Sequence, residues 1–342
     1  MQIEELWKEL EANADASETG ASGWLLRLAR PDACCPLFVG LELATRRRSV
    51  LLRLPAASVP LRRHWPRCRG LEPLAVAVGG NAHFGVGLKE ARFADVFTAL
   101  TEDLVRRVAA AAETSAQTRA FLDQLARWQK FLSASSEGLS EESQRGLWGE
   151  LHCLREHLLP TLGVVAVNGW KGGEHAHQDF QLGSRAVEVK TTLAKQPQIV
   201  RITSERQLDD SVFESLFLNV IALDVRDGNG ETLPAMVASV RAMLVTETSA
   251  REQFEDELLV AGYLDVHAAR YADQGYTVRT VAFFRVGPKF PSLVEADMPA
   301  GVGDANYALS VAACLPFAVP VADMHALLTQ WNNTQTNTEL TA

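Results

Sequence analysis

Two carboxylates and a lysine stand close together near the middle of the chain: Asp179, Glu188 and Lys190. Glu188 and Lys190 are two apart in the β-prone run AVEVKTT, so their side chains emerge on the same face of a strand. Asp179 precedes the turn QLGSR, and a hairpin there brings its carboxylate toward Glu188. Hard oxygen ligands of this kind are what Mg²⁺ prefers. The pattern predicts a site for Mg²⁺ or Mn²⁺, with Lys190 placed to orient or deprotonate an attacking water.

Further polar groups flank these three residues. Glu150 lies in an amphipathic helix that we expect from about Glu141 to Pro160, with Ser140 as its N-cap. Glu150 is either a third metal ligand or a surface residue of that helix, and Glu188 with Lys190 are alternatively a solvated pair on an edge strand. Ser204 and Gln207, after the lysine strand, either lie near the site or form the capping box of a helix that begins near Ser204.

The spacing Asp179-x8-Glu188-x-Lys190 resembles the motif of the PD-(D/E)XK nuclease superfamily, with Gln178 at the position of the motif's proline. More narrowly, the chain is similar to bacterial PD-(D/E)XK motif proteins linked to phage-defence and restriction-like gene clusters. The similarity covers most of residues 140–315, through the segments RGLWGELHCL, HQDF, VEVKTT, ITSERQL, VGPKFPSL and YALSV.

This resemblance implies an Mg²⁺-dependent endonuclease that hydrolyses phosphodiester bonds of DNA, in anti-phage defence or restriction. The implied catalytic residues are Asp179, Glu188, Lys190, Glu150 and Gln207, and the implied metal ligands are Asp179, Glu188, Glu150 and the carbonyl of Val189. It also implies protein partners from a defence gene cluster, and a homodimer that pairs two active sites. The alternatives are a non-catalytic nucleic-acid-binding or scaffold subunit of a multiprotein defence complex, and a nuclease that acts on RNA or damaged ends.

Two histidine patterns offer zinc chemistry instead. His175, His177 and Asp179 resemble the start of a metallo-β-lactamase site, but Phe180 stands where that site needs another histidine. His152, Glu156 and His157 approach an inverted zincin motif with one residue too many, and an α-helix places His157 about 100° away from the other two. We therefore expect His152 and His157 to be partly buried helix residues, and His177 at most to orient the nuclease site.

An arginine-rich stretch runs from Arg46 to Arg69 without one acidic residue, although the whole chain has a net charge of −9. Its arginines either pair with acids elsewhere or bind phosphates, and the two interpretations have equal weight. The candidate DNA contacts are Arg46, Arg47, Arg48, Arg62, Arg63 and Arg67; the stretch also holds Arg53, Arg69 and His64.

The elements that position these residues follow from hydrophobic periodicity. Short apolar runs after Trp24 predict strands, the segments from Lys89 to Ala112 and TRAFLDQLARWQKFL predict helices, and VVAVNGW, DFQL, AVEVKTT and QIVRI predict a meander of strands. The expected fold is α/β (α+β), with a restriction-endonuclease-like central mixed sheet flanked by helices. The expected segments are a β-rich domain (1–112), a helical linker (113–137), the nuclease core (138–230), a C-terminal α/β extension (231–330) and a polar tail (331–342).

Composition sets the remaining limits. At 342 residues, with 47% hydrophobic and 22% charged residues, the chain is long and apolar enough for two packed units. No run approaches the roughly 18 apolar residues of a membrane span, and the acidic amphipathic start lacks a secretory leader, so we expect a cytoplasmic protein. Five cysteines without a CxxC pair fit neither a disulfide framework nor a zinc ribbon, and we expect them in the core.

Overall fold

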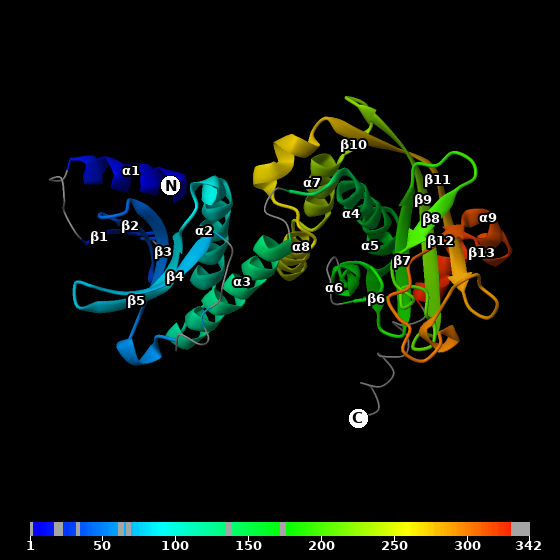
Figure 1. The fold of residues 1–342 in the computed structure, drawn as a ribbon, viewed down its shortest axis with the longest axis horizontal. Helices are drawn as coiled ribbons and strands as arrows, with labels where there is room; N and C mark the ends of the chain where they lie inside the picture. Colours follow the sequence, from blue (N-terminus) through cyan, green and yellow to red (C-terminus); the bar gives the residue numbers. More distant parts are fainter. Residues whose placement is uncertain are drawn as a thin grey trace. The chain divides into compact units, whose positions relative to one another are not determined.

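The computed structural model describes residues 3–16, 23–31, 35–60, 65, 70–134, 138–171 and 176–329 (Figure 1). By their internal contacts the residues form two compact units, Met1–Glu137 and Gly138–Ala342, called here the N-terminal and C-terminal units. Residues 113–137, expected as a linker, belong to the N-terminal unit, and residues 231–330 belong to the same unit as the expected nuclease core. The expected polar tail lies outside the described residues.

The N-terminal unit packs helices on an antiparallel sheet. The strands occur in the order β1-β2-β3-β5-β4, and every neighbouring pair is antiparallel. The elements are α1 (Ile3–Asp15), β1 (Trp24–Leu28), β2 (Leu37–Glu42), β3 (Arg47–Leu54), β4 (Leu71–Val78), β5 (Asn81–Leu88), α2 (Ala94–Ala109) and α3 (Thr114–Ala134). The helix expected from Lys89 begins five residues later, because Lys89 and Glu90 donate their N–H groups to the carbonyl of Gly70.

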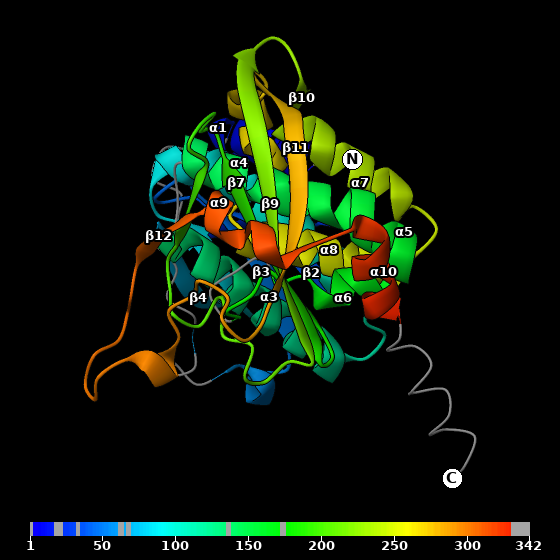
Figure 2. The same cartoon turned by 90° about the vertical axis from the view of Figure 1, so that its right-hand side faces the viewer.

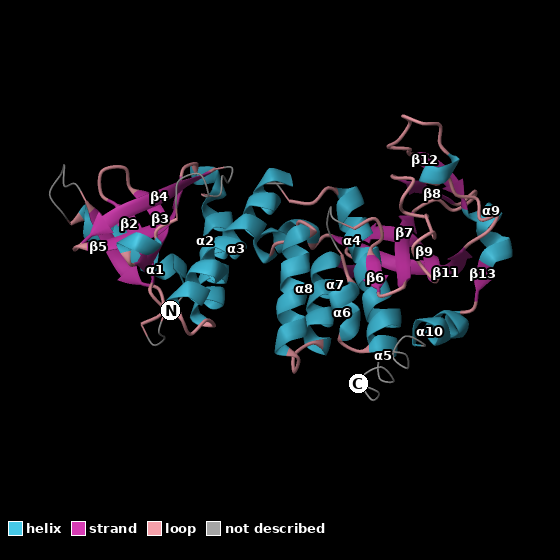
Figure 3. Cartoon of the chain, turned by 90° about the horizontal axis from the view of Figure 1, so that it is seen from below, coloured by secondary structure: helices cyan, strands magenta, loops and turns pink. Residues whose placement is uncertain are grey.

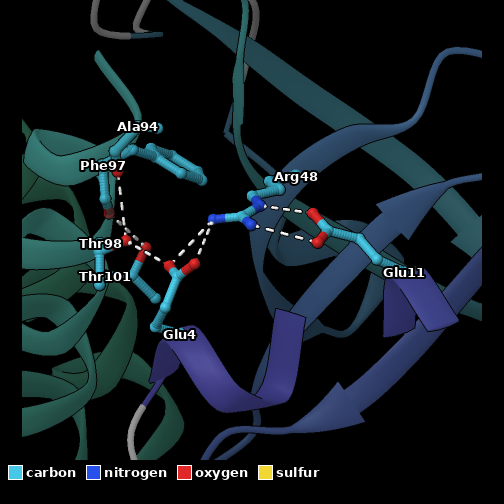
Figure 4. Close-up of polar contacts among 7 residues, drawn as sticks. All are labelled: Glu4, Glu11, Arg48, Ala94, Phe97, Thr98 and Thr101. Carbon is cyan, nitrogen blue, oxygen red and sulfur yellow. Dashed lines mark hydrogen bonds and ion pairs between the residues drawn. The ribbon is translucent and has the colours of Figure 1, made fainter. Parts of the chain in front are cut away.

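A partly buried guanidinium joins α1, β3 and α2 (Figure 4). Arg48 Nε donates to Glu11 Oε1 at 2.7 Å, and Arg48 Nη1 donates to Glu4 Oε2 at 2.9 Å. Thr98 Oγ1 donates to the same oxygen of Glu4 at 3.1 Å, so the network extends to α2. The Arg48 side chain is only 17% exposed, and it also lies over the ring of Trp7. Charge-assisted hydrogen bonds of this kind are the stronger class, so Arg48 is a structural anchor.

The C-terminal unit begins with a helical layer. Ser140 accepts a hydrogen bond from the N–H of Ser143, which confirms the expected N-cap of α4 (Glu141–Cys153). The chain continues through a π-helical turn (Leu154–Leu158) into α5 (Leu159–Leu162). The strand expected at VVAVNGW is wrong: Val165–Gly169 form the short helix α6, because one turn buries Ala166 and Val167 while Gly169 packs against Leu182. Packing here overrides the β propensity of valine.

The central sheet of this unit is mixed and has the order β10-β11-β9-β7-β6, with β13 also pairing with β11. The pair β7–β9 is parallel and the other pairs are antiparallel. The strands are β6 (Phe180–Leu182), β7 (Arg185–Thr192), β9 (Ser215–Asp227), β10 (Glu231–Thr232), β11 (Gln274–Val286) and β13 (Ala318–Val319). The expected α/β class with a central mixed sheet is confirmed.

Helices cover one face of this sheet, and a two-stranded ribbon lies on the other (Figures 2 and 3). The helical face carries Val187 and Phe217, and the ribbon face carries Ala186 and Leu216, as the strand period of two requires. The helices are α4, α6, α7 (Leu233–Met243), α8 (Thr248–Val260) and α10 (Val321–Thr329). The ribbon pairs β8 (Ile199–Ile202) with β12 (Tyr307–Ser310), and the short helix α9 (Val311–Cys314) follows.

The cysteines and the absence of a membrane-spanning run were two expectations from the sequence that bear on both units. Cys35, Cys153 and Cys314 are free and buried, as expected of core residues, and Cys34 and Cys68 lie outside the described residues. None of the helices in the described ranges is long and apolar enough to cross a membrane.

The Arg48 network leads to a stability prediction. Arg48→Met should lower the free energy of unfolding of the full chain by about 1–3 kcal/mol, because it leaves two partly buried carboxylates without their cation. Arg46→Met is the matched control: Arg46 pairs with Asp15, and both side chains are well exposed. Its cost should stay within about 0.5 kcal/mol. Urea unfolding followed by tryptophan fluorescence measures both, and equal losses would contradict the anchoring role.

Candidate active site

A tight hairpin brings the two ends of the sequence motif together. In the β6–β7 register Phe180 pairs with Val187, so Asp179, one residue before β6, lies opposite Glu188. The Val189 N–H donates to Asp179 Oδ2 at 2.7 Å, which fixes this carboxylate against β7. The other carboxylate oxygen of Asp179 is left for a further contact. Because the N–H and C=O of one strand residue point to the same side, the Val189 carbonyl also faces Asp179.

Glu188 and Lys190 project on the ribbon face of the sheet. A side chain at Gly149 of α4 would meet Thr191 and Val189, so these two residues face the helices and the alternating Glu188 and Lys190 face away from them. Glu188 is completely buried, and Lys190 Nζ lies 2.6 Å from its Oε1. Neither Glu188 oxygen makes a well-formed hydrogen bond among the described residues, although the Asp179 N–H lies near enough to lower the Glu188 pKa. Such an orphaned buried oxygen is costly unless a cation or a proton satisfies it.

Glu150 approaches the same place from the helical side. Trp170 Nε1 donates to Glu150 Oε2 at 2.8 Å and so fixes its direction. Burial raises the pKa of Glu150 well above its ordinary value, and the charges of Asp179 and then of Glu188 raise it further. Asp179, which directly precedes β6, and Glu188 of β7 are thus both near enough to Glu150 to influence its pKa.

The electrostatics of the group follow from one fully buried and two partly buried carboxyl groups near one ammonium. Burial and the neighbouring Asp179 raise the pKa of Glu188 to about 8. Burial also raises the pKa of Asp179, against the opposing effect of Lys190. Burial works to lower the pKa of Lys190, but Glu188 and Asp179 outweigh it and hold the pKa above its ordinary value. Lys190 therefore keeps its proton beside these carboxyl groups.

These residues fit a hard divalent cation by their chemistry. The donors are carboxyl oxygens and a strand carbonyl, the Glu188 oxygens lack well-formed hydrogen bonds among the described residues, and the three carboxyl groups each influence the pKa of the one ammonium. That combination is the donor set of Mg²⁺ and Mn²⁺ sites. Across the described residues no three His, Cys, Asp or Glu side chains are already gathered in ligating positions. Binding would therefore require the carboxylates to draw closer.

Gln178, at the position of the motif's proline, holds a neighbouring turn. It is 4% exposed, and its Nε2 donates to the Arg206 carbonyl at 2.7 Å while its Oε1 accepts from Gln181 Nε2 at 3.0 Å. The segment after β8 is thus tied to the residue beside Asp179. The sequence did not predict that the Gln178 side chain would hold this turn. The one available signal was that a residue with a long amide side chain stands at the position of the motif's proline.

The helix expected near Ser204 is wrong, because residues 205–208 form a turn. Ser204 Oγ accepts from the N–H of Arg206, and Gln207 Oε1 accepts from the N–H of Thr203 at 2.9 Å. Local side-chain acceptors of this kind satisfy the backbone without a helix. The Gln207 amide is therefore used within the turn that Gln178 holds.

Three histidine side chains lie next to one another at the end of α4, whereas the sequence pattern pointed to two, His152 and His157. The π-helical turn brings His157, five residues after His152, to the same side, so their ring centroids lie 6.1 Å apart instead of diverging as in an α-helix. His325 of α10 lies 5.7 Å from His157. Burial lowers the pKa of all three histidines, that of His157 to about 4.

The other zinc alternative involved His175 and His177. His175 lies outside the described residues, and His177 is exposed.

Three of the arginines proposed as DNA contacts lie in described parts of the chain, and each of them pairs with carboxylates. Arg46 pairs with Asp15, Arg47 with Glu42 and Glu72, and Arg48 with the α1 carboxylates described above. Arg53 lies over the ring of Phe38. Arg62, Arg63, Arg67, Arg69 and His64 lie outside the described residues. For Arg46, Arg47 and Arg48 the first of the two interpretations, pairing with acids, describes the observed contacts.

The mixed sheet, with an Asp before one hairpin strand and Glu-x-Lys on the next, defines the class of PD-(D/E)XK-like proteins. The sequence model of the family described as "Putative PD-(D/E)XK family member, (DUF4420)" matches residues 3–312, and the chain belongs to this family. The match extends through the N-terminal unit. No curated protein matches the chain, and no solved structure does.

The raised pKa of Glu188 predicts how stability depends on pH in metal-free buffer. The folded protein holds this proton up to about pH 8, whereas an unfolded chain releases it near 4.5, so the stabilisation is complete below pH 4.5 and is lost as the pH rises through 8. Glu188→Gln should remove this dependence. At pH 9 the variant should be more stable than the wild type by about 1–3 kcal/mol, a difference that narrows toward pH 5.

Urea unfolding in EDTA across this pH range makes the measurement. Glu247→Gln is the control, because the Glu247 side chain is exposed and has no ion-pair partner among the described residues, so this variant should behave as the wild type does. A Glu188→Gln variant that is less stable than the wild type at pH 9 would contradict the account of a carboxylate buried at a cost.

Proposed function

We propose that the C-terminal unit is a metal-dependent endonuclease that hydrolyses phosphodiester bonds of DNA. The observation that carries the proposal is the convergence of Asp179, Glu188 and Lys190 on one hairpin, with Glu150 approaching from α4. Membership in a PD-(D/E)XK family supports the same conclusion. Burying these charges together without a catalytic use is expensive, and this cost argues for function.

Each residue has a definite part in the proposed mechanism. Asp179, Glu188 and the Val189 carbonyl would hold Mg²⁺ or Mn²⁺, with Glu150 as a third carboxylate. A divalent cation, when bound, lowers the pKa of a coordinated water and neutralises charge on the phosphate. Lys190 keeps its proton beside Glu188 and donates hydrogen bonds to the phosphate as negative charge develops. The Val189 N–H keeps Asp179 oriented throughout.

A non-catalytic scaffold is the competing function, and one observation favours it. Among the described residues, no three carboxylates lie close enough together to bind one metal ion. A site that had lost its catalytic role within a multiprotein defence complex would have this arrangement. The nuclease proposal includes anti-phage defence or restriction as its setting, protein partners from such a gene cluster, and a homodimer that cuts both strands. These additions rest on the resemblance alone.

Cleavage of supercoiled plasmid by the full chain tests the proposal. With Mg²⁺ or Mn²⁺ the wild type should nick or linearise the plasmid, and EDTA should stop it. Asp179→Asn and Lys190→Met should each lower the rate at least about 100-fold, as loss of a group that stabilises the transition state does. Asparagine keeps an oxygen for the Val189 N–H, so the hairpin should survive.

Asp273→Asn is the matched control. Asp273 is exposed and precedes β11 at the end of the sheet that is remote from Glu188, so this variant should cleave as the wild type does. Metal-dependent cleavage that Asp179→Asn retains would refute the assigned site. Absence of cleavage in every protein would favour the scaffold.

A further inference from the structure

The ribbon β8–β12 has one buried face and one exposed face. Val200, Ile202 and Leu309 pack on the central sheet, in the same cluster as Ala186 and Leu218. The alternating residues of β8 point outward, so Ile199 and Arg201 are exposed. The ribbon therefore presents a surface that takes no part in the core.

Small residues leave this outer face uncovered. In the ribbon register Ser310 lies opposite Ile199 and Ala308 lies opposite Arg201, and both small residues are exposed. Arg201 has no ion-pair partner among the residues that the structure describes, in contrast to Arg46, Arg47 and Arg48 of the N-terminal unit.

A second free cation lies in the connection between β7 and β8. Lys195 is exposed, and within the described ranges it also lacks an acidic partner. Leu193, in the same connection, is 43% exposed, and Ile199 is 45% exposed. Cations alternate here with exposed aliphatic side chains along one short stretch. Phosphate groups and the sugar edges of a nucleic acid match such a surface.

The ribbon is tied to the candidate catalytic strand at both ends of β8. Thr192, two residues after Lys190 on β7, donates from Oγ1 to the Ile199 carbonyl at 3.0 Å. Arg279 Nη2 donates to the carbonyls of Leu193 and Ala194, each at 3.1 Å. At the other end Gln178, next to Asp179, holds the turn that follows β8. The position of Arg201 relative to the motif is therefore fixed by hydrogen bonds on both sides.

We infer that the outer face of the β8–β12 ribbon, through Arg201 and Lys195, binds the phosphate backbone of the duplex DNA whose scissile bond lies at Lys190. This inference rests on the proposed function and names the surface that it requires. A polyanion bound at Lys190 carries further phosphates along the same strand, and cations without acidic partners can neutralise them at no cost in lost ion pairs. Arg46, Arg47 and Arg48 would have to give up carboxylate partners to do so.

Binding measured in a cleavage-deficient background tests the inference. The probe is a fluorescein-labelled DNA duplex, the protein is full-length Asp179→Asn, and fluorescence anisotropy is recorded over a range of salt concentrations. Adding Lys195→Gln with Arg201→Gln should raise Kd at least about tenfold. The slope of log Kd against log salt concentration should fall by about 1 for each cation removed.

Arg226→Gln with Arg251→Gln is the matched control, because it removes the same charge from exposed cations on other elements of the same unit. Its Kd and salt slope should stay near those of the parent. Equal weakening by both pairs, no weakening by the ribbon pair, or no binding of the duplex by the parent would overturn the inference. Duplex binding that depends on the ribbon, in a protein whose wild type cleaves nothing, would refute the proposed hydrolysis and leave the ribbon assignment standing.

Discussion

The burial of several carboxylates around one lysine is the constraint on which the C-terminal unit depends. Glu188 is wholly inside the protein, and within the described ranges the cation that pairs with it is Lys190. Water cannot solvate this group well, so the surrounding structure must hold the charges in place and offset their mutual repulsion. The raised pKa of Glu188 and that of Glu150 are two expressions of this cost. A protein with no use for the arrangement could replace these residues with apolar ones and gain stability.

The architecture around this group follows from the alternation of side chains on β7. Val187 and Val189 pack under the helices, and this packing leaves Glu188 and Lys190 to the ribbon face. Asp179 lies at the edge, where the β6–β7 hairpin can hold it by the Val189 N–H and where Glu150 of α4 can approach it. Gln178, next to Asp179, links the turn after β8 to the site, because its side chain donates a hydrogen bond to a carbonyl of that turn. The ribbon is thus joined by hydrogen bonds to the strand and to the turn that carry the candidate site.

Local patterns were enough to predict the motif strands and the cap of α4, since period-two alternation and Ser140 are signals within a few residues. The mixed sheet was expected from the family resemblance, because its parallel pair joins strands that are not adjacent in sequence. The helix α6 was mistaken for a strand because its burial depends on Leu182, which is distant in sequence. The turn after Ser204 was mistaken for a helix because Ser204 and Gln207 satisfy the backbone in either structure. The partners of Arg46, Arg47 and Arg48 include acids on α1 and β4, which only the fold brings near. Likewise, no spacing rule could place His325 beside His157.

Isothermal titration of the metal-free protein with Mn²⁺ at pH 7, in buffers of different ionisation enthalpy, tests the central claim most directly. The claim is that the buried carboxylates form a divalent-cation site, so the wild type should bind Mn²⁺ saturably and release protons as it does, because these groups hold protons beyond their ordinary pKa. Glu188→Gln should bind far more weakly and release fewer protons, whereas the exposed control Glu247→Gln should match the wild type. Absence of Mn²⁺ binding by the wild type, or binding that Glu188→Gln leaves unchanged, would contradict the account.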